Sequence, residues 1–314
     1  ALAPSSDVAT TINVDGNAQV SSDTLAMGVA DVTNPTWTAD LGAGTGTLSS
    51  DSHGNLTYSD IEGFAFDGVA TSNLTATGGN QHFTVDVDSG NLRVQLGAAT
   101  VLTAPRGGDL SLTTDMGSNN LLVDVTNGNP MPDATLTFHA GSGSGDEMTV
   151  GPLGFNTNLN AVDHTFTNAN DGAVAVVFTT DTATIDYTGL DPIFDYLNPA
   201  TRSFTFAAGD NNIVLADDET AGNDISRISS DSSETVDFFH PSTSLTIDSG
   251  PDNESIDIQG MDANSNPIDG VIVNANAALA VRPEEHTSEL QSLVNLVCRL
   301  LLVKKKPTRA RTHT

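Results

Sequence analysis

The sequence predicts an all-β protein, a parallel β-helix or β-solenoid of stacked short strands, and two observations lead to this fold class. Apolar and polar residues alternate in short stretches such as residues 83–88 and 92–96, which is the period of half-buried strands. Clusters of Gly, Asn, Asp and Ser separate these stretches, as at residues 115–120, and such residues favour turns. No stretch up to residue 281 has a convincing helical period.

A strand–turn–strand pattern returns three times along the chain. Its strands lie at 110–112 and 121–125, at 136–138 and 148–150, and at 245–247 and 256–258. A second element, residues 57–62, resembles residues 186–192, and a strand beginning Phe-Thr follows each copy, at Phe83 and at Phe204. Repeats of this kind bury their inward faces on their neighbours by stacking. The expected inward-facing side chains are Leu112, Phe138, Val150, Phe206, Ile247 and Ile258.

These repeats predict two divergent cassettes of roughly 120 to 130 residues. We place the first cassette at residues 1–155 and the second at residues 156–281, with the boundary near residues 156–172. A third region, residues 282–314, forms a tail that we set apart from the fold. Ala1 is not Met, so we expect the front of the chain to be truncated.

The tail reads as a translated laboratory sequence. Residues 284–292, EEHTSELQS, and residues 296–302, LVCRLLL, resemble the in-frame translation of a common sequencing adapter on either side of a variable index. Residues 304–306, KKK, resemble translated poly-A. We therefore expect residues 284–306 to be absent from the native protein and to form a poorly packed appendage, with a helix at about residues 290–303.

The charge of the chain limits its partners. It has 11 Lys and Arg against 40 Asp and Glu. Up to residue 281 there are four arginines, no lysine and 37 acidic residues, which gives a formal charge of −33. Such a field repels nucleic acids and anionic lipids and favours cations. No apolar run is long enough for a membrane span.

The cysteine content is the second compositional signal. The only cysteine, Cys298, lies in the tail, so the two cassettes cannot form a disulfide. An acidic chain without cysteine fits an extracellular bacterial protein.

Residues 184–263 carry a family resemblance. The segments YTGLDPI (187–193), LADDETAGN (215–223) and SLTI (244–247) resemble repeats in very large surface or secreted proteins of environmental bacteria. The haemolysin-type nonapeptide, GGxGxDxUx with U apolar, is a related and stricter pattern. The resemblance implies a β-solenoid segment of an adhesin-like or matrix protein at the bacterial surface or outside the cell. It does not imply an activity.

Calcium is the only cofactor that these motifs suggest. In haemolysin-type repeats, aspartates and turn carbonyls bind Ca²⁺ between successive coils. Here the motifs are degenerate: residues 140–148 need a one-residue insertion to align Asp146, and Glu254 replaces the expected Asp in residues 249–256. The alternative is that these are solvated turn residues. The candidate ligands of a weak, millimolar calcium site are Asp146, Asp248, Asp252 and Glu254.

An enzyme is the main alternative, because parallel β-helices also host polysaccharide lyases and glycosidases. A lyase would need a basic residue beside cation-binding carboxylates, but the four arginines before the tail are scattered. The sequence offers no nucleophile, base and oxyanion donor in a recognisable arrangement. We therefore predict a non-catalytic structural or adhesive stalk segment, with an extracellular polysaccharide or another surface ligand as its expected partner. The alternatives are a carbohydrate-active β-helix and an array of β-sandwich modules.

The remaining motifs are interpreted as structural. The five histidines before the tail have no metal-ligand spacing. Trp37, the only tryptophan, is expected in the core rather than on a sugar-binding surface.

Overall fold

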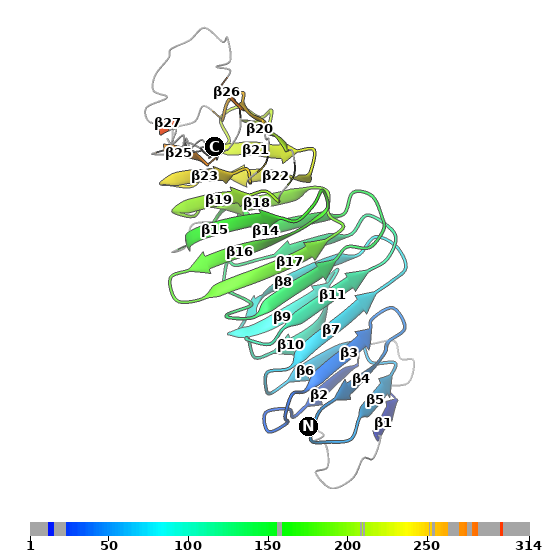
Figure 1. Cartoon of the computed structure of the whole chain (residues 1–314). Helices are drawn as coiled ribbons and strands as arrows, with labels where there is room; N and C mark the ends of the chain where they lie inside the picture. The colour runs from blue at the N-terminus through cyan, green and yellow to red at the C-terminus, as the bar shows by residue number, and fades with distance from the viewer. Residues whose placement is uncertain are drawn as a thin grey trace, which may run out of the picture.

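The computed structural model describes residues 12–15, 23–155, 159–207, 209, 211–250, 252, 255–262, 270–274, 278–281 and 296–297. These residues form 27 β-strands and no helix, which confirms the predicted all-β class. Two long sheets contain all of these strands and run along the molecule from β1 and β2 at one end to β25 and β26 at the other (Figure 1). No described residue belongs to a helix that could cross a membrane.

The larger sheet, sheet B, has 14 strands among the described residues. In spatial order they are β1 (Ile12–Asp15), β5 (Leu56–Ser59), β4 (Thr45–Ser49), β3 (Thr36–Asp40), β7 (Thr71–Ala76), β11 (Leu110–Thr114), β13 (Thr135–His139), β17 (Thr182–Thr188), β16 (Asp171–Phe178), β15 (Leu159–Phe166), β19 (Thr201–Thr205), β23 (Ser244–Asp248), β25 (Gly270–Asn274) and β27 (Leu296–Val297).

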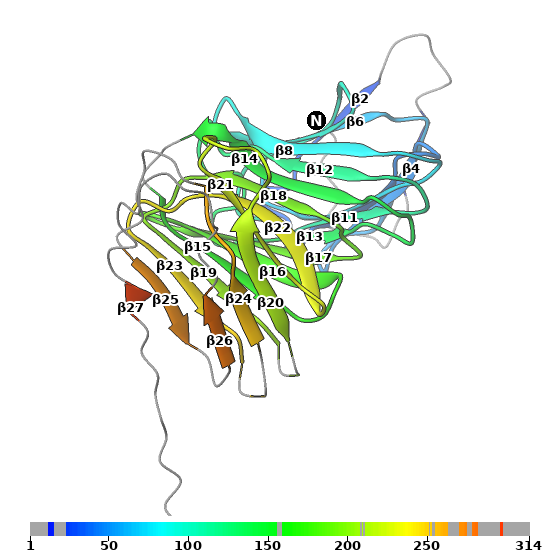
Figure 2. The ribbon, with the colours of Figure 1, turned by 90° about the horizontal axis from the view of Figure 1, so that it is seen from above.

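The second sheet, sheet A, faces sheet B and has 13 strands in the described part of the chain (Figure 2). In spatial order they are β2 (Thr24–Met27), β6 (Gly63–Phe66), β10 (Ala99–Ala104), β9 (Asn91–Leu96), β8 (His82–Asp88), β12 (Asn120–Val123), β14 (Glu147–Phe155), β18 (Ile193–Leu197), β22 (Ser233–Phe239), β21 (Ile225–Ser230), β20 (Asn212–Asp217), β24 (Ser255–Ile258) and β26 (Ala278–Val281).

Both sheets are mixed rather than purely parallel. Strands that the chain visits once before crossing to the other sheet pair in parallel, as β7 does with β11 and β12 does with β14. Four three-stranded antiparallel meanders interrupt this pattern: β3–β5 and β15–β17 in sheet B, and β8–β10 and β20–β22 in sheet A. In each meander the first strand pairs with a later part of the chain and the third with an earlier part, so the chain steps backward along the stack.

The order of meanders and single strands occurs twice. Strands β3–β14 and strands β15–β26 both follow the sequence of a meander in sheet B, one strand in each sheet, a meander in sheet A, and four single strands that alternate between the sheets. The second set begins at Leu159, close to the boundary at residues 156–172 that the sequence predicts. One hydrophobic core includes residues of both sets. Their division into two domains stays a prediction.

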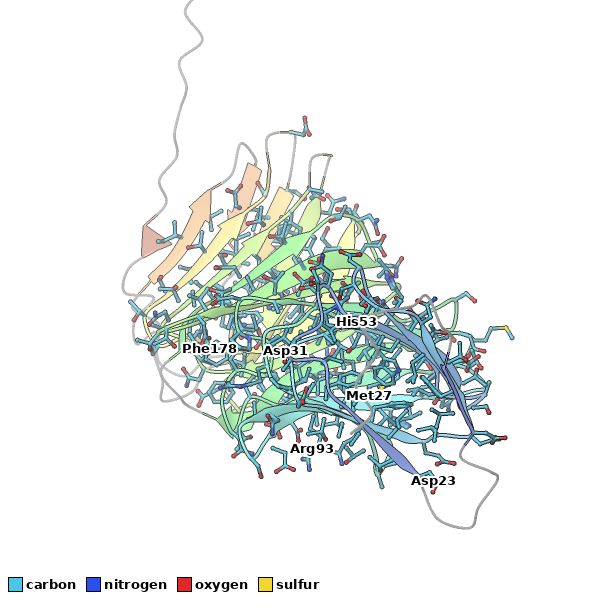
Figure 3. The ribbon with its side chains drawn as sticks, turned by 90° about the horizontal axis from the view of Figure 1, so that it is seen from below. Asp23, Met27, Asp31, His53, Arg93 and Phe178 are labelled. Carbon is cyan, nitrogen blue, oxygen red and sulfur yellow. The ribbon has the colours of Figure 1, made fainter. Side chains whose placement is uncertain are left out.

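The core lies between the two sheets, and side chains fill this space (Figure 3). Aromatic contacts join the sheets: Trp37 of β3 lies 4.3 Å from Phe64 of β6, and Phe204 of β19 lies 5.0 Å from Phe238 of β22, measured between ring centroids. Trp37 is fully buried, as expected. The predicted inward-facing set is confirmed as buried: Leu112, Phe138, Val150, Phe206, Ile247 and Ile258.

Two sequence-based expectations are wrong. Phe83 lies on β8 in sheet A and Phe204 on β19 in sheet B, so they are not equivalent positions; alternation alone cannot distinguish the two sheets. In the tail, Leu296–Val297 forms strand β27 beside β25 instead of a helix, because the free edge of β25 offers backbone hydrogen bonds. The other residues expected in that helix lie outside the described residues.

Candidate functional site

Asp146, the first candidate calcium ligand, is a buried residue of a corner between the sheets. It lies just before β14 and is 1% exposed. Its Oδ1 accepts hydrogen bonds from the backbone N–H of Asn119 at 2.7 Å and from Asn119 Nδ2 at 2.9 Å. Because Asn119 lies just before β12, the neighbour of β14, this carboxylate ties two successive corners together. The buried Asp146 carboxylate therefore stabilises the pairing of β12 with β14.

The other candidate calcium ligands also bind backbone. Asp248 accepts a hydrogen bond from the N–H of Gly250 at 3.2 Å, and Asp252 accepts one from the N–H of Gly209 at 2.8 Å. Glu254 lies outside the described residues. Among the residues that the structure describes, no three acidic, His or Cys side chains are grouped for a metal ion. Asp248 and Asp252 therefore accept hydrogen bonds from the backbone of turns. Calcium binding stays a prediction.

Two corner asparagines have equivalent roles that the sequence reasoning missed. Asn119 Nδ2 donates to the carbonyl of Ala140 at 2.9 Å, and Asn211 Nδ2 donates to that of Ser249 at 3.3 Å. Each amide also reaches carbonyls two and four residues before it. Buried carbonyls need such donors. A Gly-x-Asn-Asn pattern at residues 117–120 and 209–212 was the available signal.

A second group of polar residues joins the two sheets in the interior. His164 of β15, Asp195 of β18 and Arg202 of β19 are all fully buried. The distance from His164 Nε2 to Asp195 Oδ2 is 2.8 Å. Arg202 donates to the same oxygen through Nη1 and to the carbonyl of Leu197 through Nη2. Asp195 in sheet A thus receives one donor from each of two strands of sheet B.

The charges of this group follow from its burial. Burial, and then the charge of Arg202, hold the pKa of His164 well below its ordinary value of 6.5. His164 is therefore neutral and donates its Nε2 proton to Asp195. Burial also lowers the pKa of Arg202, but a guanidinium beside a carboxylate stays protonated. These side chains are fully buried, and the group links the two sheets in the interior.

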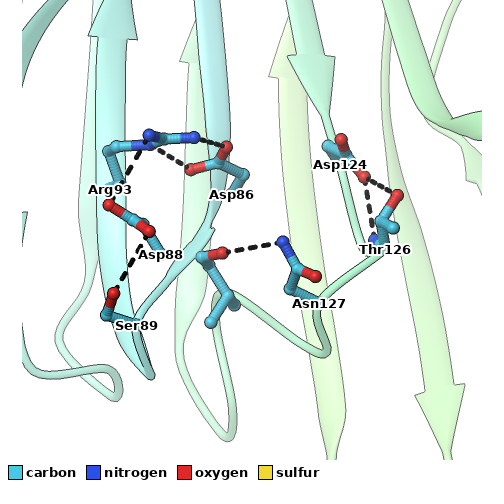
Figure 4. A network of polar contacts seen from close by, with 8 residues as sticks. Asp86, Asp88, Ser89, Arg93, Asp124, Thr126 and Asn127 are labelled. Carbon is cyan, nitrogen blue, oxygen red and sulfur yellow. Dashed lines mark hydrogen bonds and ion pairs between the residues drawn. The ribbon is translucent and has the colours of Figure 1, made fainter.

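The outer face of sheet A carries two partly buried ion pairs of a different kind. In the meander β8–β10, Arg93 Nε donates to Asp86 Oδ1 at 2.9 Å, and Nη2 bonds the second carboxylate oxygen (Figure 4). In the meander β20–β22, Arg227 Nε donates to Asp237 Oδ1 at 2.6 Å and Nη2 donates to Oδ2 at 2.8 Å. Both pairs are bidentate, which fixes the orientation of the guanidinium.

Two aromatic side chains lie on the same outer face between these ion pairs. On β18, Ile193, Asp195 and Leu197 point inward and are fully buried, whereas the intervening Phe194 and Tyr196 are partly exposed. Strand alternation therefore places both rings outward. The ring centroids are 6.0 Å apart with planes at 28°. We call Phe194 and Tyr196 the outer aromatic pair.

Comparisons with protein-family models, with curated proteins and with solved structures found no match for the chain. Three features of the structure bear on function: the buried group of His164, Asp195 and Arg202, which we call the interior link, the polar corners, and the outer face of sheet A.

Proposed function

We propose that this chain is a β-solenoid segment of an adhesin-like bacterial protein, located outside the cell or on its surface, and that it acts as a passive stalk or adhesive surface. The observation that carries the proposal is the continuous core between two sheets that run the length of the chain. Fourteen strands at a spacing of about 4.8 Å extend over roughly 60 Å. Each strand is held by its neighbours, as in repeat proteins that serve as spacers.

The interior polar contacts support a load-resisting role. Asp195 connects the sheets through His164 and Arg202, and Asp146 connects successive corners through Asn119. Buried hydrogen bonds of this kind are costly to break because the separated partners stay desolvated. The acidic composition supports solubility outside the cell, because repulsion keeps copies of the chain apart.

Pulling on the two ends of the full chain with optical tweezers tests the proposal. A stalk should hold to a high force and then lengthen in a few cooperative steps, since one core runs between the two sheets. Gradual extension at low force would contradict the proposal. Replacing Asp195 with Asn should lower the rupture force, whereas replacing the exposed Met116 with Ala provides a control outside the core.

A further inference from the structure

We propose that the outer aromatic pair, Phe194 and Tyr196, is a binding site for a neutral polysaccharide, whose sugar rings stack on the two side chains. This inference rests on the proposed adhesive function, because it names the ligand class that the surface would hold. Three features carry it: the outward position of the rings, the polar groups placed beside them by strand register, and the charge of the surroundings.

The rings of Phe194 and Tyr196 lie outside the core, whereas most aromatic side chains of the described chain are buried in it. The inward positions of β18 already supply the core with Ile193 and Leu197, so Phe194 and Tyr196 are not needed to fill it. Both rings are partly exposed, and their faces lie near each other on one strand. Aromatic rings held at a surface present a flat apolar area with little loss of side-chain entropy on binding. A pyranose ring offers a matching apolar C–H face.

Strand register places hydrogen-bonding groups next to the rings. Phe194 pairs with Thr149 of β14 on one side and with Asp237 of β22 on the other, and Asp237 pairs with Arg227 of β21. Leu122 of β12 pairs with Thr149 and continues the row. The row thus crosses five neighbouring strands. A polysaccharide laid across the strands would meet a hydroxyl, an aromatic ring, a carboxylate and a guanidinium in turn.

The ion pair in this row is suited to sugar hydroxyls. Arg227 donates from Nε and Nη2 to Asp237, which leaves Nη1 without a hydrogen-bond partner among the described residues. The Arg227 side chain is 38% exposed and the Asp237 side chain 10% exposed. Since Asp237 already fixes the guanidinium, a bound hydroxyl would meet an oriented donor.

The surrounding charges select a neutral ligand over an anionic one. Burial first, and then the carboxylates Asp237, Asp218 and Glu147, raise the pKa of the Tyr196 phenol. Three acidic groups are thus close enough to affect it, and the whole chain has a formal charge of −29. Such a field repels uronic-acid or sulfated polymers. The phenol stays protonated and can donate a hydrogen bond.

Affinity electrophoresis of the full chain tests the site. The gels would contain hydroxyethyl cellulose as the neutral polymer, polygalacturonate as the anionic polymer, or no polymer. We expect hydroxyethyl cellulose to retard the chain, and the double variant Phe194→Ala/Tyr196→Ala to bind at least tenfold more weakly. The variant Phe194→Leu/Tyr196→Leu keeps apolar bulk without the rings and should be equally impaired. A matched control, Val69→Ser/Met116→Ala, changes exposed apolar residues elsewhere and should bind normally.

Several results would overturn the site. These are no retardation by hydroxyethyl cellulose, equal retardation by polygalacturonate, unchanged binding of both ring variants, or binding in solution to polylysine alone, which would indicate a basic protein partner. Circular dichroism and thermal unfolding check that the variants fold, and the Leu variant serves if the Ala variant does not. If the binding site proves wrong, the result of the pulling experiment still stands. If the chain binds the polymer and releases reducing ends from it, the passive role is contradicted but the binding site is supported.

Discussion

The two meanders of sheet B, β3–β5 and β15–β17, share one framework but fill it with different chemistry. The third strand of each carries a buried tyrosine, Tyr58 or Tyr187, which pairs with a glycine of the middle strand, Gly46 or Gly172. A Cβ atom on Gly46 would lie 2.0 Å from the Tyr58 hydroxyl, and one on Gly172 would lie 2.4 Å from the Tyr187 hydroxyl. Each tyrosine thus lies over a residue that must lack a side chain.

The first strands differ at the same register. In the first meander Gly46 pairs with Ala39 of β3, and Trp37 precedes Ala39 by two residues. In the second meander Gly172 pairs with Phe166 of β15, and His164 precedes Phe166 by two residues. Trp37 and His164 therefore occupy equivalent positions. Trp37 donates from Nε1 to the Tyr58 hydroxyl at 2.8 Å and contacts Phe64 and Phe66 of sheet A. The second meander instead reaches sheet A through His164 and Asp195.

The difference shows that this register position requires a side chain that spans to the other sheet, and that its chemistry can vary. In the first meander the indole satisfies the tyrosine, and the contact is largely apolar. In the second, the Tyr187 hydroxyl and His164 Nδ1 are buried and have no hydrogen-bond partner among the residues that the structure describes, and the link depends on charge. Unsatisfied buried groups cost about 1–3 kcal/mol each. We therefore expect the second meander to be more sensitive to substitution and to pH.

The largest expected effect comes from Asp195→Asn. It leaves the Arg202 guanidinium buried without a counter-charge, so the free energy of unfolding should fall by about 3–5 kcal/mol. The matched change beside Trp37, Phe66→Leu, should cost about 1–2 kcal/mol. Urea unfolding measures both. Equal losses would contradict the electrostatic account of the second meander.

A double variant sharpens this prediction. Replacing Asp195 with Leu and Arg202 with Met removes both charges together, and apolar replacement of a buried ion pair is often neutral or stabilising. We expect the double variant to recover most of the stability lost in Asp195→Asn. A double variant as unstable as the single one would mean that the pair is needed for packing.

The second prediction compares Gly46→Ala with Gly172→Ala. Both substitutions place a Cβ against a tyrosine hydroxyl and a backbone carbonyl, at 2.3 Å from the Thr38 oxygen and 2.5 Å from the Thr165 oxygen. We expect losses of about 2–3 kcal/mol, with Gly46→Ala the larger because the Tyr58 hydroxyl must also leave Trp37, a further ~1 kcal/mol. Thermal unfolding of the two variants gives the order. The reverse order would show that the Trp37 bond contributes little.

The third prediction concerns pH and Glu234 of β22, whose negative charge also raises the pKa of Tyr187. Burial first, and then Asp191 and Asp171, raise the pKa of Glu234 from 4.5 to about 8. The folded state thus binds the proton more tightly than the unfolded state. The stabilising contribution of protonated Glu234 is complete below pH 4.5 and is lost as the pH rises through 8.

Glu234→Gln tests this dependence. The variant should lose less stability than the original chain between pH 5 and pH 8, and should be the more stable of the two above pH 8. Urea midpoints at four pH values between 5 and 9 give the slopes. Parallel slopes for the two proteins would rule out Glu234 as the titrating group.

The smallest effect is expected at the outer ion pairs. Arg93→Met removes the partner of Asp86, and the two side chains are 28% and 11% exposed at the outer face of sheet A. Ion pairs that solvent reaches contribute at most about 1 kcal/mol. The contribution should decrease further in 1 M NaCl. Arg202→Met, which leaves Asp195 uncompensated in the interior, should cost several times more. A comparable loss at the two positions would mean that the Arg93 pair is shielded from solvent.

The sequence was informative where a local pattern decides the structure. Alternation predicted the strands, and it correctly oriented Leu112, Phe138 and Val150 toward the core. It could not predict the meanders, because whether a strand pairs forward or backward depends on contacts distant in sequence. Both Phe83 and Phe204 satisfy the same alternation although they belong to different sheets.

The interior link could have been found from one signal. His164, Asp195 and Arg202 each occupy an inward position of an alternating strand, as Arg202 does before Phe204 and Phe206. A charged residue at such a position requires a buried partner. Which partner it finds, across 31 residues from His164 to Asp195, depends on how the sheets face each other. The outer aromatic pair shows the reverse pattern, because Phe194 and Tyr196 are aromatic residues at outward positions of an alternating strand.

The backward step of each meander has a consequence for synthesis of the chain. Strands β13 and β14 pair with β17 and β18, respectively. The ribosome makes β15 and β16 before it makes β17 and β18. Until then, the open edges of β13 and β14 can pair with another nascent chain. The second meander therefore sets a waiting period in translation, and a pause before β17 would lengthen the time during which neighbouring copies can aggregate.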